Sequence, residues 1–206
     1  MRLAPVVASC SLALSLAAPT LHSQQSAADS TPFHKGQWAA QFTAGFSFVS
    51  AGALYFRSPR SAWLLDASGA YSNLTTQTSD TLLPGQGGSS GGGTVRFGVR
   101  GYRPLAPSTL YFHTVGVVLL GGGQRVTFGT QYVDSWVWGA GAFAELGANY
   151  MITPHISLGA AAGLRVTYNE THRTEGSTST TTTTTATAKT IDVNASLLSL
   201  VLAVYF

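Results

Sequence analysis

The most constraining feature of the chain is a two-residue periodicity that runs through residues 136–168. From 136 to 150, apolar side chains hold the even positions and small or polar residues hold nearly all the odd ones. After a break at 151–154, the same alternation resumes. Successive side chains of a β-strand point to opposite faces, so this period predicts strands rather than helices. Both runs reach the roughly 9–11 residues that a tilted strand needs to cross a bilayer.

Aromatic residues sit at both ends of this apolar face, where Trp136 and Trp138 mark one end and Tyr150 the other. Amphipathic rings are enriched where a membrane meets water. The segment is therefore interpreted as a membrane-spanning β-hairpin. Extended to the whole chain, the same reasoning predicts two aromatic girdles, formed by Trp38, Trp63, Tyr71, Trp136, Trp138, Tyr150 and Tyr168.

The composition favours the same class of protein. Charged residues make up only 9% of the chain, yet no apolar run after the N-terminal region approaches the ~20 residues of a spanning helix. The 11 Lys and Arg residues are scattered and form no basic patch, so a nucleic-acid partner is not expected. The 23 glycines suit a narrow barrel with small inward side chains.

The N-terminal residues 1–23 have the pattern of a secretory signal peptide. Arg2 provides the positive start, and an apolar core is followed by small residues. Cleavage after Ala18 or Ala28 is an alternative to cleavage near residue 23. Residues 24–36 are polar and are expected to form a mobile periplasmic leader, which leaves 37–206 as the barrel domain.

The single cysteine, Cys10, lies inside this signal. A lipidated Cys10 is a weaker alternative, because few residues precede it. If Cys10 is removed with the signal, the exported protein has neither disulfide nor thiolate chemistry.

The alternation predicts an all-β fold, a closed antiparallel up-and-down transmembrane β-barrel. An even number of strands can close without leaving sheet edges in lipid. Three aperiodic segments rich in Gly, Ser or Thr are predicted to be exposed loops, at 73–93, 121–135 and 170–189. The eight strands are expected at residues 37–48, 52–57, 62–72, 94–102, 109–120, 136–150, 156–168 and 190–206.

Facing is clear for most of these strands and uncertain for two, the fifth and the last. In the first strand Phe48 is assigned to the lipid side, and in the second Leu54 and Phe56 are placed outward. The fifth strand carries apolar residues on both faces, so its facing stays open. In the last strand the apolar phase changes, which predicts a β-bulge near Ser196.

The C-terminal strand ends in an aromatic residue preceded by apolar residues at alternate positions. With the segment 149–165, it resembles small eight-stranded outer-membrane β-barrel proteins of Gram-negative bacteria, the porin-like group, over residues 37–206. The resemblance implies an outer-membrane location among lipids and lipopolysaccharide, and recognition of the last strand by the barrel-assembly machinery. Tyr205 departs from the usual phase. The residues of the assembly signal would be Leu198, Leu200, Leu202, Val204 and Phe206.

Charged residues on the inward face are the main candidate site. Because an eight-stranded bore is only just filled by side chains, we expect them to form ion pairs that plug it. Asp66 and Arg100 are predicted to be the best pair, and a polar conduction path is the alternative. The full set is Asp66, Arg96, Arg100, Glu145 and Arg165.

Catalysis, cofactors and metals are not expected. His155, Ser157 and Glu170 loosely suggest a lipid A deacylase, but a strand's length separates His155 from Glu170. The glycine-rich stretches lie outside a phosphate-binding context, and the five histidines lack metal-ligand spacing.

The sequence thus predicts a monomeric barrel with a structural or surface-interaction role. The same scaffold also serves other activities. The alternatives are a lipid A-modifying enzyme, a narrow channel and a soluble lipocalin-like barrel whose faces would be reversed.

Overall fold

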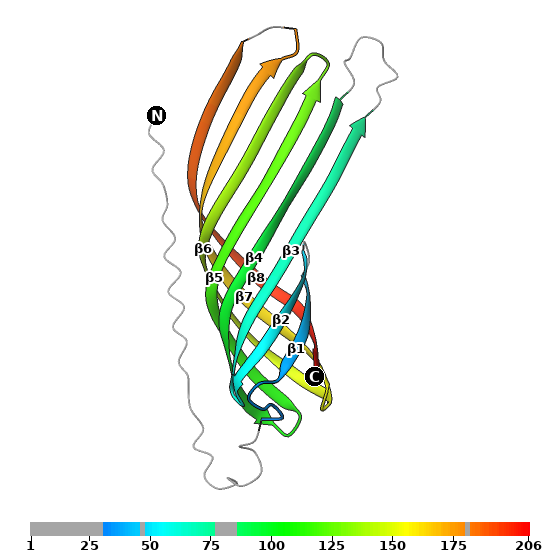
Figure 1. The fold of residues 1–206 in the computed structure, drawn as a ribbon, viewed down its shortest axis with the longest axis vertical. Coiled ribbons are helices and arrows are strands. Elements are labelled where there is room, and N and C mark those ends of the chain that lie inside the picture. The colour runs from blue at the N-terminus through cyan, green and yellow to red at the C-terminus, as the bar shows by residue number, and fades with distance from the viewer. Residues whose placement is uncertain (1–30, 46–47, 77–85, 180–181) are drawn as a thin grey trace, which may run out of the picture.

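The computed structural model describes residues 31–45, 48–76, 86–179 and 182–206, and its regular elements are all β-strands. Each strand pairs antiparallel with its sequence neighbours, and β1 pairs with β8, so the sheet closes into a barrel (Figure 1). The predicted all-β, eight-stranded closed barrel is confirmed. The strands are β1 (Trp38–Gly45), β2 (Val49–Ser58), β3 (Ser61–Thr76), β4 (Gln86–Ala106), β5 (Thr109–Phe128), β6 (Gln131–Thr153), β7 (Ile156–Ser177) and β8 (Thr183–Tyr205).

Three short turns at Pro59, Pro107 and Pro154 lie at the same end of the barrel as the C-terminus, and this end is called the turn end below. The opposite end is called the far end. No helix in the described part of the chain is long and apolar enough to cross a membrane.

The prediction of three long loops is wrong for most of their residues. β3 and β4 stay paired out to Thr76 and Gln86, and β7 and β8 stay paired out to Gly176 and Thr183. Between β5 and β6 only Gly129 and Thr130 remain, and Gly129 takes the positive φ of 59° that glycine adopts without strain. The hydrogen bonds between paired strands are made by backbone groups alone. Strands that lie in water can therefore stay paired without an alternation of apolar and polar side chains.

The first hairpin is much shorter than the others. β1 has 8 residues and β2 has 10, whereas the other six strands have between 16 and 23. In Figure 1, β1 and β2 stop well below the far ends of β3 to β8, which continue as a curved sheet. The barrel is therefore fully closed only in the part that carries the turn end, where β1 pairs with residues 199–205 of β8.

The facing predicted for β2 is wrong. Leu54 and Phe56 are fully buried in the lumen, and Tyr55 points outward, with its ring centroid 4.9 Å from that of Trp38. The register explains the inversion, because Tyr55 pairs with Trp38 on one side and with Trp63 on the other. Directly paired residues share a face of the sheet.

Phe48 was also assigned to the wrong face, since its side chain lines the internal cavity described below. Phe46 lies outside the described residues. On β5, Leu110 and Phe112 are buried inside while Val115 and Val117 are exposed, which resolves the facing that the sequence left open.

The bulge predicted near Ser196 is confirmed. Ala161 pairs with Ser199 but Gly163 pairs with Ser196, so one extra residue of β8 is accommodated between them. Because of this register shift, the apolar residues of β8 face outward on both sides of the bulge. At the end of the same strand, Tyr205 is buried in the lumen.

The N-terminal segment closes the turn end. Phe33 is only 4% exposed, and its ring lies 4.4 Å from that of Phe56 and 4.9 Å from those of Tyr102 and Tyr205. The Gly36 amide donates a hydrogen bond to the Phe56 carbonyl at 2.8 Å. The mobility expected of the leader is therefore wrong for residues 31–36, while the signal peptide and residues 24–30 lie outside the described part of the chain.

Candidate functional site

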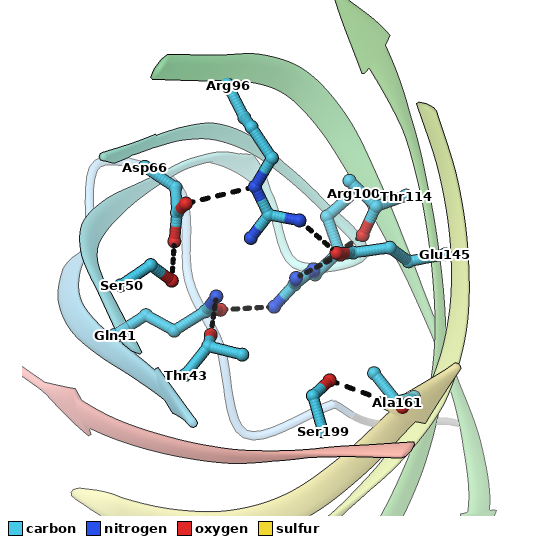
Figure 2. A network of polar contacts seen from close by, with 10 residues as sticks. All are labelled: Gln41, Thr43, Ser50, Asp66, Arg96, Arg100, Thr114, Glu145, Ala161 and Ser199. Atoms are coloured by element: carbon cyan, nitrogen blue, oxygen red, sulfur yellow. Dashed lines mark hydrogen bonds and ion pairs between the residues drawn. The ribbon is translucent and has the colours of Figure 1, made fainter. Parts of the chain in front are cut away.

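A network of four charged side chains crosses the lumen (Figure 2). Asp66 lies directly opposite Arg96 in the β3–β4 ladder, and Arg96 Nε donates to Asp66 Oδ1 at 3.0 Å. Arg96 Nη1 donates to Glu145 Oε1, and Arg100 Nη2 donates to Glu145 Oε2 at 3.4 Å. Two arginines and two carboxylates thus form a continuous, balanced chain of ion pairs.

The predicted pair of Asp66 with Arg100 is wrong. Arg100 stands opposite Ala62, nearer the turn end than Arg96 on the same face of β4. Its carboxylate partner comes from β6 instead, which is two strands away around the barrel. Glu145 therefore bridges both arginines.

Neutral side chains complete the hydrogen bonding of the most buried charges. Asp66 and Arg100 are each 1% exposed. Ser50 Oγ donates to Asp66 Oδ2 at 2.7 Å, and Arg100 donates from Nε to Thr114 at 2.8 Å and from Nη1 to Gln41. Because buried charges are tolerated only when paired and hydrogen-bonded, these contacts make the lumen network stable.

Aromatic rings fill the bore between this network and the turn end. The Arg100 guanidinium lies 4.2 Å from the ring centroid of Phe112, and Tyr102 stacks on Phe56. Ser157 and the hydroxyl of Tyr205 share a hydrogen bond of 2.9 Å. Solvent barely reaches any of these side chains, so the bore is plugged at this end.

Arg165 differs from the other lumenal charges. It lies on β7 opposite Phe143 and Asn194. Within the described part of the chain no carboxylate lies within ion-pair distance of it, and its Nε is buried without a hydrogen-bond partner. Its side chain lines two open cavities of about 570 and about 530 Å³.

The seven residues predicted to form the girdles all lie on the outer face. Some of them make ring contacts there: Trp63 stacks on Phe97, and Trp136 stacks on His172 at 4.1 Å. Their exposed fractions range from 37% to 73%, for Trp38, Trp63, Tyr71, Trp136, Trp138, Tyr150 and Tyr168.

The residues of the hypothetical deacylase triad do not converge. Ser157 is buried against Tyr205 near the turn end. Glu170 lies toward the far end of β7, where it bonds to His172 Nε2 at 2.9 Å and approaches Lys189. Sequence reasoning missed the Glu170–His172 pair, although a spacing of two on one strand places both on one face. The described residues include no group of three His, Cys, Asp or Glu that is able to hold a metal ion.

Four of the five residues named as an assembly signal are exposed. Leu198, Leu200 and Leu202 point outward from β8, and Phe206 is 70% exposed at the chain end. Val204 is partly covered.

No family model and no curated protein sequence matches the chain. Among solved structures, it is similar to a major outer membrane protein from Thermus thermophilus, with a TM-score of 0.51 and 17% identity over 82% of this chain and 98% of that chain. It is also similar to the outer membrane protein OprG from Pseudomonas aeruginosa, with a TM-score of 0.50 and 14% identity over 85% and 99%. At these identities the likeness is one of fold, and the chain has the eight-stranded barrel fold of outer-membrane proteins.

Proposed function

We propose that the protein is a bacterial outer-membrane barrel with a structural and surface-interaction role, not an open channel. The plugged bore carries this proposal. A channel needs a continuous polar path, whereas the turn end is filled by Phe33, Phe56 and Tyr205 below the paired charges. The same side chains give a barrel of this size a solid core.

The outer face supports the membrane setting. Large apolar side chains are exposed along the strands, as Val115, Leu146 and Leu164 illustrate, and exposed aromatic rings bound this zone. Such a band suits lipid acyl chains, and the rings suit the headgroup levels. In this proposal the protein is a monomer surrounded by outer-membrane lipid and lipopolysaccharide. The outward residues of β8 and Phe206 are read by the assembly machinery.

The far end supplies the interaction surface. There β3 to β8 extend beyond the closed barrel, and the side chains of residues 183–190 are all exposed. This segment is rich in threonine, which favours strands and offers hydroxyl groups for hydrogen bonds. It would meet extracellular partners first.

Cysteine labelling on intact cells tests this orientation, because the only native cysteine lies at position 10. Thr185→Cys, at the far end of β8, should react with a membrane-impermeant maleimide on intact cells. The matched control Pro107→Cys, in a turn at the other end, should react only after the cells are lysed. Labelling of both before lysis, or of Pro107→Cys alone, would refute the proposal.

A further inference from the structure

The barrel wall has an opening on one side, above the short first hairpin. The last pair between β2 and β3 is Ser50 with Ser68, and the last pair between β1 and β8 is Gly45 with Ser199. Beyond these points, β3 pairs only with β4 and β8 only with β7 among the described residues. The free edges of β3 and β8 therefore border a gap in the wall above the first hairpin, and Figure 1 shows β1 and β2 ending below the other strands.

In the proposed setting this opening lies at the depth of lipid. The part of β8 that has lost its β1 partner carries Ile191, Val193 and Leu198, which point outward and are 73%, 65% and 50% exposed. An unsatisfied backbone polar group in hydrocarbon costs several kcal/mol. The edges of the opening therefore favour an occupant that brings polar atoms to this depth.

A cavity of about 570 Å³ lies directly behind the opening. Its lining includes both margins of the gap, with Ser50 and Ser68 on one side and Asn194 and Leu198 on the other. Phe48 contributes an apolar surface at the mouth. The cavity thus has an apolar entrance that faces outward from the barrel axis.

The inner end of the same cavity is lined by four charged side chains, because Asp66 and Glu145 lie there beside Arg96 and Arg165. Each of the two arginines has one buried guanidinium nitrogen without an acceptor, Nη2 of Arg96 and Nε of Arg165. Asp66 and Glu145 already serve Arg96 and Arg100. Within the described residues, the charge of Arg165 has no counter-ion. Buried donors and an uncompensated charge together call for an anion at this place.

We infer that the cavity binds an anionic amphiphile with a single acyl chain, which enters sideways from the membrane. The carboxylate or phosphate head accepts hydrogen bonds from Arg165 and from the free nitrogen of Arg96. The acyl chain leaves between β3 and β8, past Phe48 and Leu198. The direction of entry rests on the proposed membrane location, whereas the site itself rests only on the cavity and its charges.

Binding is measured on the folded full-length protein in nonionic micelles, with dodecanoate and dodecyl phosphate as probes and native mass spectrometry as the readout. One equivalent of either anion should bind, and dodecyltrimethylammonium should not. Equal retention of the cationic amphiphile would overturn the inference. Binding of inorganic phosphate as tight as that of dodecyl phosphate would overturn the role of the acyl chain.

Variants locate the site. Arg165→Gln should weaken dodecanoate binding at least about tenfold, because the charged donor is lost. Arg165→Lys keeps the charge and should retain most of the affinity. Arg125→Gln, which removes an exposed arginine paired with Asp134 outside this cavity, should leave binding unchanged. Unchanged binding in Arg165→Gln, or an equal loss in Arg125→Gln, would refute the assignment.

A third change tests the entrance. Ser68→Trp places a large ring at the margin of the opening and should lower dodecanoate affinity without changing the heat-modified mobility of the folded barrel. Unaltered affinity in this variant would refute the placement of the acyl chain between β3 and β8. Cell fractionation separates the two proposals: absence from the outer membrane refutes the location, and failure to bind dodecanoate in micelles refutes the site.

Discussion

Arg96 on β4 lies directly opposite Asp66 on the neighbouring strand β3, and the two side chains meet inside the lumen at 3.0 Å between Nε and Oδ1. Asp66 is buried, so the pair is shielded from water. The same guanidinium also reaches Glu145, which in turn reaches Arg100. The stability of the bore therefore depends on a shared network more than on isolated pairs.

Replacement of Asp66 by Asn should destabilise the barrel strongly. It removes one partner of a buried pair and leaves the arginine charge undercompensated, a change that typically costs about 3–5 kcal/mol. The unfolding free energy from urea titration of the micelle-folded protein measures this loss. Asp134→Asn is the control, because its ion pair with Arg125 is exposed and should contribute no more than about 1 kcal/mol.

Asp66→Asn and Glu145→Gln should not be additive. Both carboxylates bind Arg96, so a double-mutant cycle should give a coupling free energy of about 0.5–3 kcal/mol. The measurement is the same urea titration on both single variants and the double variant. A coupling of zero would mean that the two ion pairs act independently.

Phe33→Ala should weaken the plug at the turn end. Loss of the buried ring removes its contacts with Phe56, Tyr102 and Tyr205, and comparable truncations cost about 3–5 kcal/mol. The shift from folded to unfolded mobility on a heat-modifiability gel should occur at a lower temperature. Leu105→Ala, at an exposed position, should leave that temperature unchanged.

Gly129→Val should destabilise the turn between β5 and β6. A β-branched residue does not readily adopt a φ of 59°, and strain of this kind costs roughly 1–3 kcal/mol. Thr130→Val in the same turn provides the matched control. Equal urea midpoints for the two variants would show that the positive φ is not required.

The sequence predicts the closed barrel and the faces of β6 and β7, because lipid requires apolar side chains at alternate positions. It does not predict how far the strands extend. Three consecutive glycine pairs between β4 and β5, such as Gly92 with Gly122, form a ladder with no side-chain period at all. The short β2 carries apolar residues on both faces, so only its register with Trp38 and Trp63 decides its facing.

The inward position of the five charged residues also follows from the alternation, but their partners do not. Arg96 is identified as the partner of Asp66 only once the β3–β4 register is known. One feature of the sequence points to a packed Phe33: it is a lone aromatic residue in a polar segment close to the first strand. Its contacts come from strands far apart in the chain, which no local pattern reveals.

Conductance of the folded wild-type protein in a planar lipid bilayer tests the plugged bore most directly. With aromatic rings and paired charges across the turn end, inserted protein should produce no stepwise increase in current, and Asp66→Asn should lower stability without creating one. Reproducible ohmic steps from the wild-type protein would show an open path and would contradict the account.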